Sequence, residues 1–528
     1  MTKNHIQTIR RSPLFTIHNS LFIAAVLLCS CSLDEHPRDQ ITEEEAYTTA
    51  SALYQNTVAT LYNYIGGYED GQGLQGTCRG VYDLQTFGSD EAMLPTRGGD
   101  WYDGGLWQDM YRHSWSAGHD LPKNAWLYLY KVITLCNRSL ERLDAHQSLL
   151  SADQLAAYTA EVRALRAIYY WYLLDLFGPV PLVTSSDVSM QEVKQESRAK
   201  VFSFAIRELQ AAFPLLSTEN STQPGDYYGR VTRPVALFVL AKLMLNAEVY
   251  GGTPYWDQVI FYCDQIESLG YRLEPDYATN FSVHNETSTE NIWTIPMDKH
   301  LYLNQQQNLY RSYHYRHAAA YGFTAENGSC ATLRALDIFG YGSDDEDTRF
   351  SRCYWSGTVV DLDGQTVTDR TGRPLTYYPH EVSLVLSNSA YVETAGARMK
   401  KYAVDKNATK DGKLMDNDIV LFRYADVLLM RAEARLRLGQ DGQTDFDAVR
   451  SRVDMPPRPL TLQNLLDERL LELCWEGWRR QDLIRFGQYQ SLYDGSDRTN
   501  ESDGHTALYP IPADVMALNH NLVQNPGY

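Results

Sequence analysis

The sequence predicts a mainly α-helical protein whose helical pairs are interrupted by one loop-rich insertion. Apolar residues recur at helical spacing in several segments, and glycine follows where most of these segments end. The stretch over 280–417 instead has short segments between Gly, Asn, Asp and Ser turns, with scattered aromatic residues. We therefore expect a single domain over 46–528, with a helical N-terminal half to about residue 279, an insert bearing short strands over 280–417 and a helical C-terminal part over 418–528.

The clearest predicted helix runs from Val162 to Phe177 and stops at Gly178-Pro179. A second runs from Pro234 to Tyr250, because proline suits a first helical turn and two glycines follow the segment. Paired amphipathic helices of this kind are typical of tetratricopeptide-repeat-like units, whose apolar faces are buried by stacking on neighbours, although the period here is irregular. Further helices are predicted at Trp256–Leu269, from near Ile419 to Gly439, at Phe446–Val453 and at Leu462–Trp475.

The first thirty residues have the composition of a secretory signal. A cationic start precedes an apolar run over Leu21–Leu28, which is far shorter than the ~20 residues that a membrane-spanning helix needs. Leu28-Cys29-Ser30-Cys31 has the form of a bacterial lipobox, so cleavage would leave Cys31 N-terminal and acylated, and hence anchored to outer-membrane lipid. We predict a lipoprotein signal peptide over 1–30 and a lipidated N-terminus with an acidic tether over 31–45. The alternative is an ordinary signal peptide with a structural cysteine nearby.

The charge balance argues against nucleic acid as a partner. Removal of residues 1–30 deletes three basic residues and no acidic one, so the formal net charge of −19 becomes −22, and such a chain is repelled by phosphate. Six cysteines follow Cys31 without CxxC or Cys/His spacing, so we predict no metal site, no disulfide framework and no cofactor. The acidic run Asp344–Asp347 lacks the spacing of an EF-hand loop, which favours a solvated turn over a calcium site.

The aromatic content is high, with 37 Tyr and 10 Trp, and one loop combines aromatic residues with polar ones. Trp101, Tyr102 and Trp107 lie there among Asp, Arg and Gly. A sugar ring has an apolar C–H face and hydroxyl edges, so it stacks on an indole while carboxylate, amide or guanidinium groups bind its rim. The three residues are therefore candidate saccharide contacts. The alternative for Trp101 is that it packs beneath its own loop.

Four stretches carry a family resemblance. Together, and in this order behind a lipobox, they resemble the SusD/RagB family of surface nutrient-binding lipoproteins, and the likeness runs over essentially the whole mature sequence. The stretches are Arg163–Tyr170 leading into Leu176–Leu182, Phe422–Ala434, Glu468–Arg485, and Tyr509–Pro512 with Asn519–Tyr528.

The resemblance implies a SusD-like fold and a function in capture. Members bind nutrients, here most simply an oligosaccharide released from a polysaccharide, and act without catalysis as a lid over a SusC-like TonB-dependent transporter. The acidic residues after Cys31 resemble the signal that directs such lipoproteins to the outer face of the outer membrane. We therefore expect a lipid-anchored, surface-exposed protein of the outer membrane.

The resemblance also suggests further ligand contacts. Cys330, as a small apolar contact, and Arg398, as a hydroxyl donor, lie in segments that resemble ligand-facing loops of glycan-binding members. Asn63 and Asp83 are candidates for the polar rim on the N-terminal side.

The stretch Glu468–Arg485 has carboxylates and guanidiniums at helical spacing. This pattern predicts partly buried ion pairs, including one between Arg479 and Asp482. A general acid/base role for Glu472 and Glu476 is the alternative.

Three other functions remain open at this stage. The RagB type implies a peptide ligand on the same scaffold. A surface glycoside hydrolase would need two carboxylates across a cleft, roughly 5 or 6.5–9.5 Å apart. The repeat-like helices would also suit a purely structural scaffold.

Overall fold

The computed structural model describes residues 46–67, 69–302, 304–491 and 503–528. Contacts divide the chain after Thr48, and the compact unit from Thr49 to Tyr528 contains every element discussed below. The predicted signal peptide, Cys31 and the tether lie outside the described residues. Within the described residues helices predominate and strands form only short antiparallel pairs, which confirms the mainly α-helical fold class.

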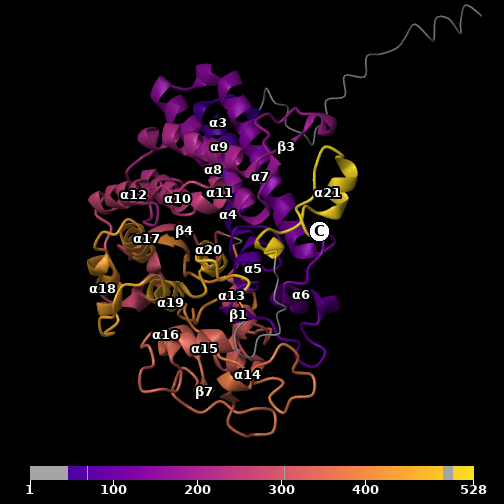
Figure 1. Cartoon of the computed structure of the whole chain (residues 1–528), viewed down its shortest axis with the longest axis vertical. Coiled ribbons are helices and arrows are strands. Elements are labelled where there is room, and N and C mark those ends of the chain that lie inside the picture. Colours follow the sequence, from indigo (N-terminus) through magenta and orange to yellow (C-terminus); the bar gives the residue numbers. More distant parts are fainter. Residues whose placement is uncertain (1–45, 68, 303, 492–502) are drawn as a thin grey trace, which may run out of the picture. The chain divides into compact units, whose positions relative to one another are not determined.

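Successive long helices of this unit pack on one another in chain order, from α7 to α17. Figure 1 shows α8 and α9 at one end of the unit and the loop-rich segment with α14 and β7 at the other. The helices that form the stack are α7 (Asp120–Ala145), α8 (Ala152–Phe177), α9 (Arg198–Ala212), α10 (Arg233–Leu245), α12 (Trp256–Ser268), α17 (Tyr424–Arg437), α18 (Gln443–Ser451) and α19 (Leu462–Leu473).

The α8 helix begins ten residues before its predicted start. Ser151 caps it by accepting from the Gln154 backbone N–H, while the Gln154 side chain accepts from the Ser151 N–H, a reciprocal capping box. The polar first turns of α8 carry no apolar stripe, so periodicity alone does not find them. The helix ends as predicted, because Gly178 adopts φ +73° directly after Phe177.

Two predicted helices are wrong in part. The segment Pro234–Tyr250 is two helices, because α10 ends at Leu245 and α11 (Ala247–Gly251) follows Asn246. Residues Ile419–Arg423 form strand β10 rather than the first turns of a helix, and α17 begins only at Tyr424. This apolar run pairs antiparallel with β4 (Asn291–Ile295), and the register shifts on either side of Phe422. Pairing with this distant segment determines the conformation of the run.

The strands other than β4 and β10 also form short pairs, most of which involve the loop-rich insert. None of the described helices has the length and hydropathy needed to cross a bilayer. The strands are β1 (Ala92–Met93) with β5 (Cys330–Ala331), β2 (Val180–Pro181) with β3 (Gln195–Glu196), β6 (Tyr354–Trp355) with β9 (Arg398–Met399), and β7 (Gly357–Thr358) with β8 (Thr376–Tyr377). The short helices are α3 (Ala50–Tyr54), α4 (Thr60–Gly66), α5 (Val81–Thr86), α6 (Leu106–Arg112), α13 (Gln307–Ser312), α14 (Tyr315–Ala320), α15 (Leu333–Phe339), α16 (Phe350–Cys353), α20 (Arg479–Arg485) and α21 (Ala513–Leu518).

A buried ion network joins the insert to the C-terminal helices. Arg423, at the end of β10, contacts Glu472 at 2.5 Å, and Glu290 and Glu476 at 2.8 Å each. All four side chains are buried. Around them the network includes five cations and five carboxylates, so its formal charges balance: Arg349, Lys401, Arg423, Arg450 and Arg452 with Glu290, Asp347, Glu468, Glu472 and Glu476.

The buried ion pairs of the structure bear on three hypotheses about charged residues. Glu472 and Glu476 lie in ion pairs away from solvent, as the ion-pair interpretation predicts. Asp347, expected in a solvated turn, is instead buried against Arg349 at 2.8 Å. Arg479 pairs with Asp90 at 2.6 Å, not with Asp482, because its guanidinium points across to the segment that follows α5.

Loss of the Arg423 guanidinium should destabilise the fold strongly. Arg423→Met would leave three buried carboxylates short of a partner, so we expect the free energy of unfolding in urea to fall by about 3–5 kcal/mol. Arg352→Met is the matched control, because the Arg352 pair with Asp276 is 36% and 66% exposed and should contribute less than about 1 kcal/mol. Equal losses in the two variants would contradict the role given to the network.

The same network predicts acid lability. Burial would raise the pKa of Glu472, but the charges of Arg452, Arg423 and Arg349 outweigh burial and hold that pKa well below its ordinary value. A depressed folded-state pKa contributes stability above the ordinary glutamate pKa, and this stability is lost as pH falls. Unfolding free energy measured from pH 7 downwards should therefore decrease for the unaltered protein, and less steeply for Glu472→Gln, which lacks the titrating group.

Candidate functional site

A recess of about 510 Å³ lies where the loop before α6 meets the segment around α13 and α14. We call it the tryptophan recess. Its lining residues are Asp70, Cys78, Arg79, Gly99, Asp100, Trp101, Asp103, Gln307, Tyr315, Ala325, Glu326 and Lys413.

The backbone that presents Trp101 is tightly folded. Arg97 and Asp100 exchange two backbone hydrogen bonds of 3.0 Å across Gly98-Gly99, so the chain reverses immediately before the tryptophan. Trp101 itself has φ +61° and Asp103 has φ +43°, conformations that cost a non-glycine residue about 1–2 kcal/mol. Such strain persists only where the surroundings enforce it, and it is frequent at functional sites.

The Trp101 ring is fixed by three contacts. Its Nε1–H donates to the Glu326 carbonyl at 3.0 Å, and its edge packs against Trp107 with ring centroids 6.1 Å apart. Gly328 lies beneath the ring, where a Cβ would come within 2.7 Å of the indole. The indole N–H is thus satisfied by the protein, and the partly exposed ring remains in the recess as an apolar surface.

The rim of the recess is polar and carries more negative than positive charge. Arg79 bridges Asp70 at 2.8 Å and Asp103 at 2.7 Å. The Tyr315 hydroxyl donates to Asp100 at 2.8 Å, and burial together with this carboxylate raises the pKa of Tyr315 to about 12.

Glu326 and Lys413 complete the set of charges on this rim. Burial raises the pKa of Glu326, whose carboxylate accepts from Gln307 at 3.0 Å and faces Lys413 at 3.8 Å. The rim therefore offers carboxylate oxygens, a guanidinium, an amide and a phenol.

Asp83 lies under the recess and not on its rim. Its carboxylate forms a two-pronged pair with Arg311, at 2.8 and 2.9 Å, and accepts from the Arg79 backbone N–H at 2.6 Å. Both side chains are buried. Asp83 therefore supports the loop that carries Arg79, and its expected place on the rim is corrected.

The two other aromatic candidates separate in the structure. Trp107 is buried, donates to Asp103 at 2.9 Å and contacts the guanidiniums of Arg79 and Arg311 through its ring. It supports Trp101 and has no surface for a ligand. Tyr102 is 54% exposed beside the recess without lining it.

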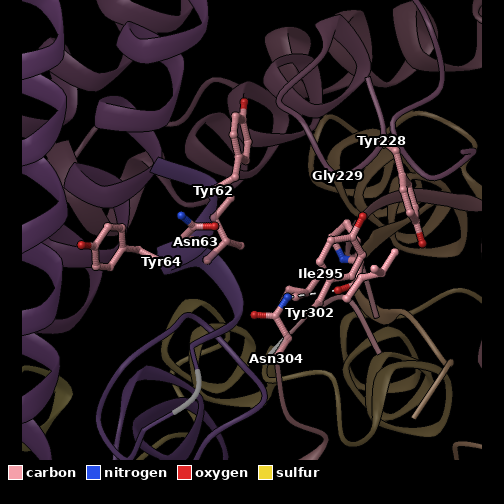
Figure 2. Close-up of a pocket in the computed structure, with 11 residues that line it drawn as sticks. Tyr62, Asn63, Tyr64, Tyr228, Gly229, Ile295, Tyr302 and Asn304 are labelled. Carbon is pink, nitrogen blue, oxygen red and sulfur yellow. Dashed lines mark hydrogen bonds between the residues drawn. The ribbon is translucent and has the colours of Figure 1, made fainter. Parts of the chain in front are cut away.

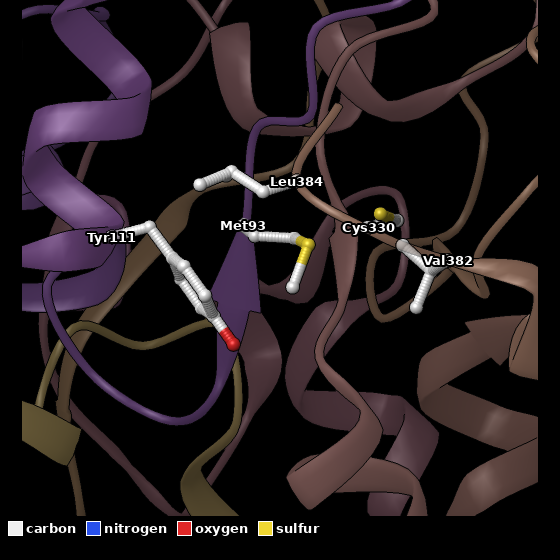
Figure 3. Close-up of a cluster of buried hydrophobic side chains, with 5 residues drawn as sticks. All are labelled: Met93, Tyr111, Cys330, Val382 and Leu384. Carbon is white, nitrogen blue, oxygen red and sulfur yellow. The ribbon is translucent and has the colours of Figure 1, made fainter. Parts of the chain in front are cut away.

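Cys330 and Arg398 are also interior residues. Figure 3 shows Cys330 in an apolar cluster with Met93, Val382 and Leu384. Arg398 is fully buried, donates to the Glu393 carbonyl at 2.9 Å and lies over the Tyr377 ring. As with Asp83, burial removes both residues from the candidate surface.

Asn63 lines a different cavity, a cleft of about 560 Å³ that we call the tyrosine cleft. Figure 2 shows Asn63 on one side of it and Tyr228 and Tyr302 on the other, while the Tyr64 ring points away from them. Its lining residues are Tyr62, Asn63, Tyr64, Ile65, Tyr228, Gly229, Ile295, Pro296, Leu301, Tyr302 and Asn304.

Comparison with known proteins identifies the family. A model described as "SusD family" matches residues 281–528, and one described as "Starch-binding associating with outer membrane" matches residues 81–245. The starch-binding protein SusD of Bacteroides thetaiotaomicron is 26% identical over 507 residues, which cover 88% of each chain. The chain belongs to the SusD-like family. The resemblance stated from its sequence motifs is thereby confirmed, and the second description points to association with the outer membrane.

Solved structures confirm the SusD-like fold. Surface glycan-binding protein A from Bacteroides thetaiotaomicron in complex with laminarihexaose has a TM-score of 0.71 at 19% identity, covering 90% of this chain and 100% of that one. A laminarin-binding SusD-like protein has the same TM-score at 22% identity, covering 91% and 100%.

Sequence reasoning about this SusD-like protein missed most of the recess. The stretch over 66–116 is also rich in turn residues and includes Asp70 and Arg79, and Tyr315 lies in a tyrosine-rich run over 310–321, so the sequence holds weak signals for these three. Nothing in the local sequence marks Lys413, which reaches the recess from a turn almost a hundred residues further along the chain.

Removal of the Asp83 charge separates a supporting role from a ligand-binding one. Asp83→Asn would leave the buried Arg311 cation without its counter-ion, so we expect a loss of about 3–5 kcal/mol in urea unfolding. Asp100→Asn, on the exposed side of the recess, is the control and should change stability by about 0.5 kcal/mol or less. Unchanged stability in Asp83→Asn would return Asp83 to the list of possible ligand contacts.

Proposed function

We propose that this SusD-like protein captures oligosaccharides in the tryptophan recess and passes them to a SusC-like TonB-dependent transporter, without covalent chemistry. The observation that carries the proposal is the position of the Trp101 ring. Its N–H donates to the Glu326 carbonyl, Gly328 packs beneath it, and hydrogen-bonding groups surround it on the rim of the recess. An oligosaccharide needs this combination, because stacking covers its apolar face while rim groups bind its hydroxyls.

The relatives support the saccharide class. One curated relative is named a starch-binding protein, and two solved structures of the same fold are described with laminarin or laminarihexaose. Tyr102, exposed beside the recess, is a further proposed contact for a longer sugar chain.

The partners of the rim carboxylates favour binding over hydrolysis. Asp70, Asp100 and Asp103 all lie in ion pairs or hydrogen bonds with cationic or phenolic groups. Glu326 has a raised pKa, but its carboxylate is shared between Gln307 and Lys413. These partners suit fixed hydrogen-bond acceptors for sugar hydroxyls, and we therefore propose capture without catalysis.

Removal of the Trp101 ring should weaken saccharide binding. A buried aromatic face contributes about 1.5–3 kcal/mol, so Trp101→Ala should bind about ten- to a hundredfold more weakly, and Trp101→Phe should lie between the two. The measurement is calorimetric titration of residues 32–528 with starch and laminarin oligosaccharides, other plant, fungal and host glycans, and a peptide digest.

Trp256→Ala serves as the control, because Trp256 is also partly exposed but lies at the start of α12, outside both cavities. It should bind as the unaltered protein does. Binding of peptides alone would favour the RagB-type function. Saccharide binding that is indifferent to Trp101 would refute the site.

We also propose that the protein is anchored at the cell surface by acyl chains on Cys31. The lipobox motif and the outer-membrane family description support this proposal. Cys31→Ser should abolish incorporation of labelled palmitate and release the protein from the membrane fraction, because acyl chains supply the anchoring free energy. Cys29→Ser, which keeps Cys31, is the matched control and should stay labelled. Labelling that survives in Cys31→Ser would show that the lipidation site is elsewhere.

A further inference from the structure

The tyrosine cleft and the tryptophan recess share two chain segments among those that line them. The segment 62–79 contributes Tyr62 and Asn63 to the cleft and Arg79 to the recess. A second segment contributes Asn304 to the cleft and Gln307 to the recess. Because Asn304 and Gln307 are three residues apart, their Cα atoms are separated by at most about 11 Å.

Close backbone packing fixes the separation of the two cavities. The Gln307 N–H donates to the Gly76 carbonyl at 2.8 Å, which ties one segment to the other. A Cβ on Gly66 would lie 2.3 Å from the Asn304 side chain, and one on Gly73 would lie 2.2 Å from the Gly66 carbonyl. Only glycine permits these approaches, so the two cavities are held side by side by a segment with little freedom to shift.

The tyrosine cleft has unused polar groups next to aromatic surface. Among the described residues, the Asn63 amide and the Tyr302 hydroxyl have no hydrogen-bond partner, and both side chains reach solvent. Asn304 donates through Nδ2 to the Pro296 carbonyl at 3.0 Å, which leaves its Oδ1 as an acceptor. Tyr302 is 39% exposed, so its ring offers a face as well as a hydroxyl.

The walls of the cleft are preorganised. The Tyr228 hydroxyl donates to the buried carboxylate of Asp418 at 2.7 and 2.9 Å, and the Tyr62 hydroxyl donates to Glu161. These two phenols hold their rings in place and do not compete for a ligand, so binding in the cleft would order few side chains.

Charge distinguishes the chemistry that fits. The cleft is lined by no ionisable side chain other than tyrosine among the described residues, and the recess carries four carboxylates against two cations. A sulfated or uronic-acid sugar would be repelled by the recess and would find no cation in the cleft.

We propose that the tyrosine cleft is a second saccharide subsite, and that one uncharged, extended oligosaccharide occupies it together with the tryptophan recess. This inference rests on the proposed function of the recess. Two linked sites bind a chain that reaches both much more tightly than a chain confined to one, because the second contact is intramolecular.

The test is calorimetric titration with malto-oligosaccharides and laminari-oligosaccharides of increasing length, from the disaccharide upwards. For the series that binds, affinity should rise on the order of 10²-fold once the chain is long enough to reach the cleft. The double variant Asn63→Ala with Tyr302→Ala should lose this rise and keep the affinity of the unaltered protein for the shortest oligomers that bind. Trp101→Ala should weaken binding at every length.

The control is Tyr255→Ala, because Tyr255 is 44% exposed, comparably to Tyr302, and lies outside both cavities. It should retain the full dependence on length. Oligogalacturonate is the anionic probe, and it should bind more weakly than a neutral chain of equal length.

The outcomes separate the inference from the function on which it rests. Short oligomers that bind through Trp101, with no gain on lengthening or with a gain that survives in the double variant, would overturn the second subsite and leave the proposed function intact. Tighter binding of oligogalacturonate would overturn the uncharged class. Failure of the unaltered protein to bind any saccharide of the panel would overturn the proposed function and this inference together.

Discussion

The fold depends on a charge that has no access to water. Arg423 lies where strand β10 passes into helix α17, and its guanidinium contacts Glu290, Glu472 and Glu476. Glu290 directly precedes β4, Glu472 lies in α19 and Glu476 lies in the turn after α19. Each of these carboxylates would be intolerable in the interior alone, so the segments that carry them are stable only when assembled. Arg349 and Lys401 extend the same requirement to the insert. The loops between the helical halves are thereby held in one arrangement.

The tryptophan recess is rigid because buried contacts hold the segments that line it. Asp83 and Arg311, 228 positions apart, connect α5 to α13 under the recess, and the Glu326 carbonyl holds the Trp101 indole. Ligand contacts therefore come from loops, whereas their positions are set by buried pairs and by glycine contacts. This division lets the exposed residues vary without loss of the scaffold, which is consistent with relatives of 26% identity and below that share the fold and are described with different glucans.

The sequence predicts this fold well where the information is local. Apolar stripes and stop signals predict the end of α8 at Phe177, and they predict the bounds of α12 and α19 to within two residues. The loop around Trp101 combines aromatic and polar residues within a few positions. The sequence predicts poorly where a partner far along the chain determines the conformation or the burial of a residue. Ile419–Arg423 becomes a strand only through β4, and Asp83 and Arg398 look like rim residues until their buried partners are known. Charged residues are ordinarily exposed, so their burial cannot be read without the partner that makes it possible.

The left-handed backbone at Trp101 is strained for any residue with a side chain, whereas the recess needs the side chain at this position. A glycine at this position would relieve the strain at φ +61°, yet it would delete the ring that the recess displays, together with the contacts of that ring with Trp107 and Glu326. A chain that retains an aromatic side chain here keeps the strained turn, and a partly exposed aromatic residue with positive φ becomes a mark by which such surfaces can be sought in other chains of this fold.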